Sequence, residues 1–174
     1  MPSCLAATRC YRPRRVRYIL LDRITLLQAP ELARGVKCVS LSDDCFTDHF
    51  PGHPIMPGAL IIESLAQLAG VLLEQTLRDR RGAPAGSELH ALLTMIDRAK
   101  FRHVVRPGDK LELEARVLRA TEDGGQADGV ATVDGQRVAE AQLSFAFAKV
   151  SNPAMLAKRR EFLDIWLTGS AGEP

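Results

Sequence analysis

Residues 49–70 read HFPGHPIMPGALIIESLAQLAG, and this stretch decides the fold. The first half, residues 49–58, holds three prolines and two glycines. Each proline fixes φ and removes a backbone N–H, so we expect a rigid loop there rather than a regular element. The second half is apolar and rich in helix-forming residues, with Glu63 as its one carboxylate. It predicts a buried helix from Pro57 to about Leu77, and proline suits the first turn of a helix.

The remaining chain predicts strands on both sides of this helix. Residues 33–41 alternate between apolar and polar, as in a half-buried strand, and residues 18–27 predict a short helix or turn leading into a first strand. After residue 89 the period changes to two, which predicts four strands over 90–101, 110–120, 127–133 and 137–149. Residues 153–167 predict a terminal amphipathic helix. One long helix followed by antiparallel strands indicates an α+β fold, with the helix against one face of the sheet.

Composition excludes several classes of protein. A chain of 174 residues with 46% hydrophobic and 25% charged residues fits one folded domain. No apolar run reaches the ~20 residues that a membrane-spanning helix needs. The cysteines show no C-x-x-C spacing, so neither a zinc site nor a redox pair is indicated. Free thiols fit a reducing compartment, and we expect a cytoplasmic location.

The net charge of +2 is unevenly distributed. Residues 1–17 contain five arginines and no acid, which is typical of a transit peptide, of a basic arm or of a flexible leader. Pro13 interrupts any amphipathic helix there, which favours the leader. We therefore divide the chain into a basic leader at 1–16, a folded domain at 17–150, and a helical extension with a tail at 151–174.

Four segments carry a family resemblance. They are H-F-P-G-x-P-x-M-P-G with a glutamate five residues after its last glycine, LLDRI at 20–24, IESLAQLAG at 62–70 and IDRAKFRHVVRPGDKLELE at 96–114. Together they resemble the FabZ-like 3-hydroxyacyl-acyl-carrier-protein dehydratases of type II fatty acid synthesis, over roughly residues 17–149. The resemblance implies a dimerising hot-dog fold, in which an antiparallel sheet wraps a long central helix. Asp48, where the family usually has glycine, and the two chain ends depart from the pattern.

The same segments supply a set of candidate catalytic residues. His49 is the expected base, because an imidazole exchanges protons near neutral pH. Glu63 is the expected acid for a leaving hydroxyl, and Gln67, one helical turn later, is placed to hydrogen-bond it. Gly58, next to Pro57 at the start of the helix, is the expected oxyanion donor, because the N–H groups of a helix N-terminus favour negative charge.

Two further groups of residues have a functional and a structural interpretation. One group could line an acyl tunnel or simply pack in the core: Phe50, Ile55, Met56 and Phe101. The other group is a basic stripe, which could contact an acyl carrier protein or could be an ordinary solvated strand face. Its members are Arg98, Lys100, Arg102 and Arg106. Nucleic acid is a poor alternative, because no aromatic residues are interleaved with these charges. The prolines between His49 and His53 preclude the shared helical face of a metal site, so no metal is expected.

The predicted function is dehydration of (3R)-3-hydroxyacyl thioesters on the acyl carrier protein to trans-2-enoyl thioesters, without a cofactor. The resemblance implies a homodimer with active sites shared between subunits, and a hexamer of three dimers stays open. One alternative is a hot-dog acyl thioesterase, which activates water instead of removing a C2 proton. Another alternative is a non-catalytic hot-dog subunit that pairs with an active dehydratase.

Overall fold

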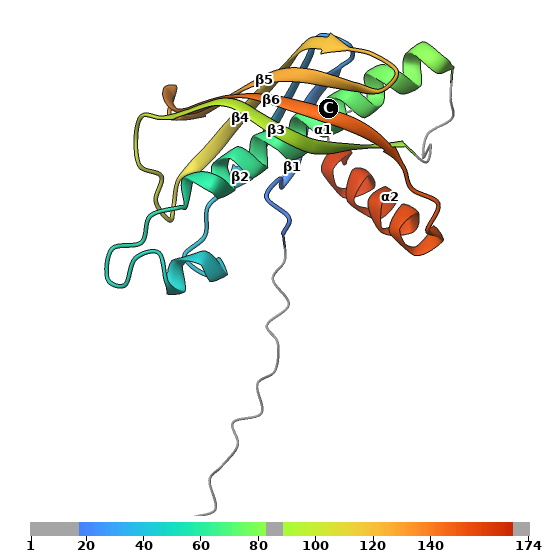
Figure 1. Cartoon of the computed structure of the whole chain (residues 1–174). Coiled ribbons are helices and arrows are strands. Elements are labelled where there is room, and N and C mark those ends of the chain that lie inside the picture. Colours follow the sequence, from blue (N-terminus) through green and yellow to red (C-terminus); the bar gives the residue numbers. More distant parts are fainter. Residues whose placement is uncertain (1–17, 83–88, 169–174) are drawn as a thin grey trace, which may run out of the picture.

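Helix α1, Gly58–Arg81, lies across one face of a six-stranded antiparallel sheet (Figure 1). The computed structural model describes residues 18–82 and 89–168. The strands follow the order β1-β2-β4-β5-β6-β3, which places β1 and β3 at the two edges. Their bounds are β1 Arg23–Gln28, β2 Leu32–Cys38, β3 Leu89–Phe101, β4 Lys110–Ala120, β5 Gly124–Val133 and β6 Gln136–Lys149. The α+β prediction and the hot-dog arrangement of helix and sheet are confirmed.

Both ends of α1 are set by its sequence. Pro57 is the N-cap residue, and its carbonyl accepts from the Leu60 N–H at 2.9 Å. At the other end Gly82 adopts the left-handed conformation, φ 59°, from which its N–H bonds back to the carbonyls of the last turn. Arginines in that last turn complement the helix dipole. The predicted helix therefore forms and runs one turn further than expected.

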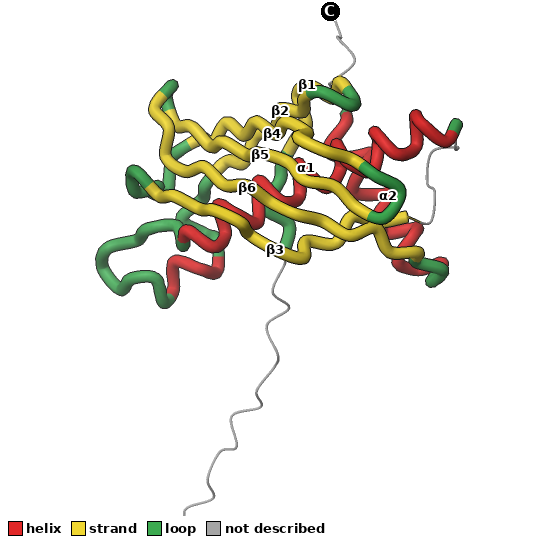
Figure 2. The backbone as a smooth tube through the Cα atoms, turned by 45° about the horizontal axis from the view of Figure 1, so that its top comes forward, coloured by secondary structure: helices red, strands yellow, loops and turns green. Residues whose placement is uncertain are grey.

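The core lies between α1 and the sheet. Leucines on the sheet side of the helix are completely buried, at positions 65, 68, 72 and 73. The opposite side of α1 is only partly covered by other parts of the chain. Helix α2, Pro153–Leu167, lies below the C-terminal half of α1 in Figure 1 and beside it in Figure 2. Its Trp166 is buried and stacks with Phe162, ring centroids 5.8 Å apart, so α2 contributes to the core.

The length and composition of α1 alone would allow it to cross a membrane. Within this domain, however, 78% of its most apolar window is buried. It is the core helix of the domain.

Two expectations about local structure were wrong. Residues 18–22 form no helix or turn, because Gln67 of α1 binds the backbone of Tyr18 and Leu20 and because the Asp22 N–H bonds to the Val36 carbonyl. They therefore run extended into β1.

Strand β5 begins at Gly124 rather than at Ala127, so Gly124 and Gly125, expected in a turn, belong to the strand. Gly124 pairs with Ala146, and a Cβ on Gly124 would collide with the carbonyl oxygen of Phe145. Glycine serves here for the close approach of two strands rather than for a turn.

The predicted terminal helix at 153–167 is confirmed as α2. Asn152 caps it by accepting hydrogen bonds from the N–H groups of Ala154 and Met155. The predicted leader at 1–16 and the last residues of the predicted tail lie outside the described residues.

Candidate active site

His49 lies in the loop between a short 3-10 helix, Asp44–Thr47, and α1. Its N–H donates to the Cys45 carbonyl and its own carbonyl accepts from the Ile55 N–H, both at 3.1 Å. The ring nitrogen Nδ1 lies 2.8 Å from the Ile55 carbonyl oxygen. A carbonyl only accepts, so Nδ1 carries the proton and the lone pair of the neutral ring is on Nε2. This contact therefore leaves Nε2, the nitrogen that a base would use, without the proton.

The loop joins α1 through Met56 and Gly58. Met56 is buried, and its N–H donates to the Val105 carbonyl at 2.8 Å. The Gly58 N–H is among the first four of the helix, which have no acceptor within it. A Cβ on Gly58 would lie 2.7–3.0 Å from ring atoms of Phe101. Any larger residue at position 58 would therefore displace the Phe101 ring that packs over the helix start, and the predicted oxyanion donor lies against a predicted tunnel residue.

Glu63 and Gln67 are joined by the predicted hydrogen bond, with Gln67 Nε2 2.9 Å from Glu63 Oε1. The Gln67 amide also accepts from the Leu20 N–H and donates to the Tyr18 carbonyl, both at 3.0 Å. These two backbone groups fix the orientation of the amide, because one only donates and the other only accepts. No hydrogen bond from the described residues reaches Glu63 Oε2.

A groove of about 380 Å³ runs along the face of α1 that carries Glu63. Glu63, Gln67, Gly70 and Glu74 all line it, and their i, i+4, i+7, i+11 spacing keeps them on one face of the helix. Its apolar walls are formed by Ala66, Ala91, Leu92, Leu93 and Phe145. The predicted acid therefore stands at one end of an elongated, partly apolar groove.

The far end of this groove contains an ion cluster that sequence reasoning missed. Glu74 is buried and accepts from the Ala91 N–H and from Arg159 Nη2 of α2, both at 3.0 Å. His90 Nδ1 lies 3.6 Å from Glu74 Oε1, the oxygen that also accepts from the Ala91 N–H. Burial raises the pKa of the Glu74 carboxyl, but the interactions with His90, Arg159 and the Ala91 N–H outweigh it and lower the pKa overall. The available signal was the spacing of 11 residues from Glu63, which puts both carboxylates on one face.

None of the four predicted tunnel residues lines this groove. Phe50 is 53% exposed and stacks on the His49 ring, centroids 4.1 Å apart. Ile55 is half-buried, Met56 packs in the core, and Phe101 covers Gly58. These side chains surround the loop and the helix start, so their contact with an acyl chain stays a prediction.

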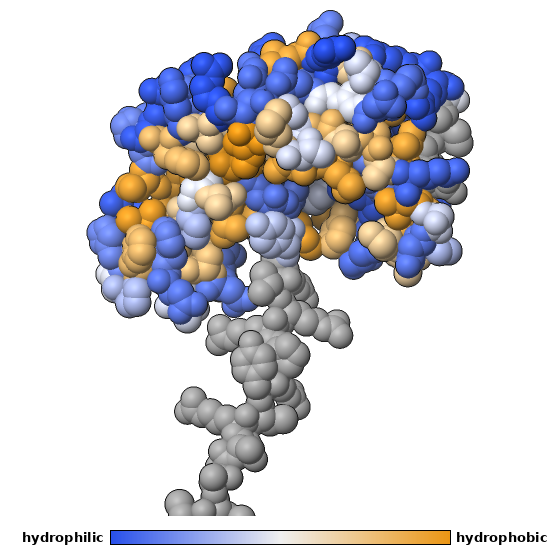
Figure 3. All heavy atoms as spheres, in the orientation of Figure 1, coloured by the Kyte–Doolittle hydropathy of each residue, from blue (hydrophilic) through white to orange (hydrophobic). Residues whose placement is uncertain are grey.

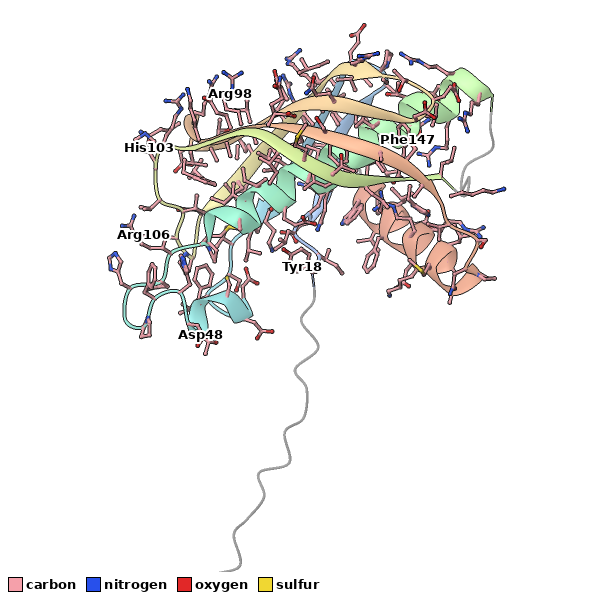
Figure 4. All side chains as sticks on the ribbon, viewed as in Figure 1. Tyr18, Asp48, Arg98, His103, Arg106 and Phe147 are labelled. Carbon is pink, nitrogen blue, oxygen red and sulfur yellow. The ribbon has the colours of Figure 1, made fainter. Side chains whose placement is uncertain are left out.

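The predicted basic stripe is interrupted by acids. Arg102 Nη2 lies 2.7 Å from Glu140, which Arg137 also contacts, and both hydrogen bonds lower the pKa of that carboxyl. Arg98 lines a surface hollow together with Asp128 and Glu140. In Figure 4, Arg98 and Arg106 lie at the same end of the molecule as the loop that carries Asp48. The described residues contain no cluster of three or more His, Cys, Asp or Glu that would hold a metal ion.

The chain combines a helix on an antiparallel sheet with a histidine loop at the helix start and a glutamate on the helix. This combination fits the dehydratase class of hot-dog proteins that the sequence resembles. Residues 13–142 match the model of the FabA-like domain, and the chain belongs to this family. It is 42% identical over 139 residues to a 3-hydroxyacyl-[acyl-carrier-protein] dehydratase FabZ from Bacillus velezensis, covering 79% of this chain and 92% of that one. A FabZ from Campylobacter jejuni is 44% identical over 131 residues, covering 75% and 88%.

The fold has solved counterparts as well. A hot-dog-like protein from Thermanaerovibrio acidaminovorans superposes with a TM-score of 0.55 at 20% identity, covering 77% of this chain and 92% of that one. This likeness supports the fold alone.

Proposed function

We propose that this protein dehydrates (3R)-3-hydroxyacyl thioesters, carried on the acyl carrier protein, to trans-2-enoyl thioesters in fatty acid synthesis. The observation that carries the proposal is the hydrogen bond from Gln67 that holds Glu63 on α1, together with the contact that leaves the lone pair of His49 on Nε2. FabZ dehydratases more than 40% identical over most of the chain support the substrate class. The corresponding location is the cytoplasm.

The reaction needs a base, an acid and a stabilised oxygen. His49 Nε2 takes the proton from C2, and the electron pair of that bond forms the C2=C3 double bond. Glu63 gives a proton to the C3 hydroxyl, which leaves as water when the C3–O bond breaks. The Gly58 N–H, at the positive end of the α1 dipole, stabilises the charge that develops on the thioester oxygen. Gln67 holds the Glu63 carboxyl in one orientation throughout.

A homodimer forms part of this proposal. Strand β3 is an edge strand that only β6 pairs within the described residues, and it exposes a row of apolar side chains: Leu92, Leu93, Met95 and Ile96. Figure 3 shows apolar side chains gathered in a band across the middle of the face on which β3 lies. A long apolar edge strand with unpaired backbone groups readily pairs with another chain. A second copy of the protein is the proposed occupant.

The active sites of this dimer are shared between subunits. The described hydrogen bonds and ring contacts of His49 go to Cys45, Ile55 and Phe50, and those of Glu63 go to Gln67. None of these described contacts joins His49 to Glu63 within one chain. A histidine from one subunit facing the glutamate of its partner brings base and acid to one substrate.

The first test is hydration of a crotonyl thioester, followed by loss of the enoyl absorbance. Wild type is expected to be active, and His49→Ala and Glu63→Gln are each expected to lose about 10³-fold or more in kcat. Release of free thiol would indicate a thioesterase instead. An inactive wild type, on carrier-protein thioesters as well, would favour the non-catalytic subunit.

Co-expression of the two inactive variants tests the shared site. A mixed dimer has one site with both residues intact and one with neither, so random pairing restores about a quarter of wild-type activity. If base and acid came from the same chain, every site would lack one of them and the mixture would stay inactive. Light scattering on the same samples separates a dimer from a hexamer.

A further inference from the structure

The groove beside Glu63 has a defined length. Its α1 wall runs from Glu63 to Glu74, and 11 residues of helix span about 16 Å. Gly70 lies between them and leaves the middle of the groove open, because a Cβ there would have only ordinary contacts, the closest at 3.7 Å to Ala91. An apolar chain whose reacting carbons lie at Glu63 therefore has room to extend toward Glu74.

Helix α2 lies at the other end of the groove. Met155 and Arg159 of α2 line the groove there, and Arg159 is held by Glu74. The Arg159 guanidinium also lies over the Trp166 ring, 5.5 Å from its centroid, so its position is fixed from two sides. Residues 153–167 follow the part of the chain that matches the FabA-like domain, which ends at residue 142. The end of the groove is thus built by a segment beyond that match.

We propose that α2 forms the end wall of the acyl groove and that Arg159, held by Glu74, sets the longest acyl chain the protein accepts. The inference rests on the proposed function, because it assigns the groove to the acyl chain of the same substrate. A methyl end offers the charged pair no hydrogen bond, and displacing Arg159 would leave the buried Glu74 carboxylate without its cation. The wall therefore resists a chain that is too long.

The span gives an estimate of that length. A hydrocarbon chain advances somewhat less than one C–C bond, ~1.5 Å, per carbon, so the groove takes on the order of a dozen carbons. Affinity is expected to rise with each added methylene up to about this length and to fall beyond it.

The test uses a binding measurement that needs no turnover. Pantetheine thioethers with saturated alkyl chains of graded length, from short to long, are titrated into the full-length protein by calorimetry. The chain length at which the affinity stops rising is the break. Arg159→Ala is expected to move this break to longer chains and to raise the affinity ratio of the longest to the shortest probe about tenfold or more. Arg160→Ala, an exposed neighbour on the same helix, is the matched control and should leave the break unchanged.

A second variant acts in the opposite direction. Gly70→Leu fills the middle of the groove and is expected to move the break to shorter chains, so the proposal stays testable if Arg159→Ala fails to fold. Folding of each variant is checked by circular dichroism. A break that is the same in wild type and in a folded Arg159→Ala or Gly70→Leu protein would overturn the proposal.

Turnover separates this inference from the proposed function. Enoyl thioesters of the same lengths are assayed for hydration in parallel. A chain-length break that shifts in binding while wild type turns over no substrate would support the end wall and reject the dehydratase. Turnover by wild type with an unshifted break in the variants would support the dehydratase and reject the end wall.

Discussion

Gln67 donates a hydrogen bond to Glu63 across one turn of α1 while its own amide is held by the backbone of Tyr18 and Leu20. The Glu63 carboxyl is therefore held through Gln67 by backbone groups that lie 47 and 49 residues before Gln67 in sequence. In the proposed function, Gln67 is a positioning residue whose effect would reach the reaction only through Glu63.

Replacing Gln67 with alanine is expected to lower kcat about 10- to 100-fold with a smaller change in KM, because a misplaced acid costs rate more than binding. The free energy of unfolding should fall by about 1 to 2 kcal/mol from the lost hydrogen bonds to Tyr18 and Leu20. Steady-state kinetics and urea denaturation measure the two effects. Gln75→Ala, on the same helix but bonded to Asp79, is the control and should keep kcat. A Gln67→Ala protein with wild-type kcat would contradict the positioning role.

A methyl group at Gly58 is expected to displace the Phe101 ring, whose atoms lie within 3.0 Å of its position. Phe101 is 54% exposed and has room to turn away, so Gly58→Ala should change the free energy of unfolding by less than about 1 kcal/mol. It should nevertheless reduce kcat/KM about tenfold, because the ring lies over the proposed oxyanion donor.

Adding Phe101→Leu to Gly58→Ala should recover part of this loss, because leucine removes the clashing ring. A double-mutant cycle in kcat/KM measures the coupling, with the Phe101→Leu single variant as its control. Purely additive effects would show that the contact between Gly58 and Phe101 does not bear on the reaction.

The Glu74 cluster predicts an acid-sensitive contribution to stability. Its pKa is lowered in the folded protein, so the stabilisation is complete above the unfolded value of about 4.5 and is lost as the pH falls through the lower folded pKa. The stability difference between wild type and Glu74→Gln should therefore be largest near neutral pH and shrink below about pH 4.5. Denaturation curves from pH 7 to 3 measure it. Glu161→Gln, which breaks only the exposed pair with Lys158, should show no such trend.

An apolar replacement of the whole ion pair is expected to be tolerated. Arg159→Leu alone leaves a buried carboxylate and should cost about 3 kcal/mol, whereas Glu74→Leu with Arg159→Leu should be neutral or stabilising by about 1 to 4 kcal/mol. The double variant also removes Arg159 Nε, which is buried without a hydrogen-bond partner in the described part of the chain. Thermal or urea denaturation compares the three proteins. A double variant less stable than Arg159→Leu would show that the pair itself stabilises the fold.

Local sequence signals predicted the parts of the fold that depend on neighbouring residues. Prolines and glycines marked the His49 loop, apolar composition marked α1, and two-residue periodicity marked the strands after residue 89. Gln67 was found as a partner of Glu63 because residues four apart meet on a helix.

Contacts between distant segments could not be predicted in this way. Arg159 meets Glu74 from 85 residues away, and its place depends on where α2 packs. The extended course of residues 18–22 depends on Gln67, and the pairing of Gly124 depends on β6. Each of these outcomes was decided by tertiary contacts that outweigh local preference.

The groove face of α1 is tied to both ends of the described chain, to Tyr18 at the Glu63 end and to Arg159 at the Glu74 end. Purification tags and fusion partners are commonly attached at chain termini, so their effect on these two contacts has to be controlled. Kinetic constants for this protein should therefore be measured after tag removal.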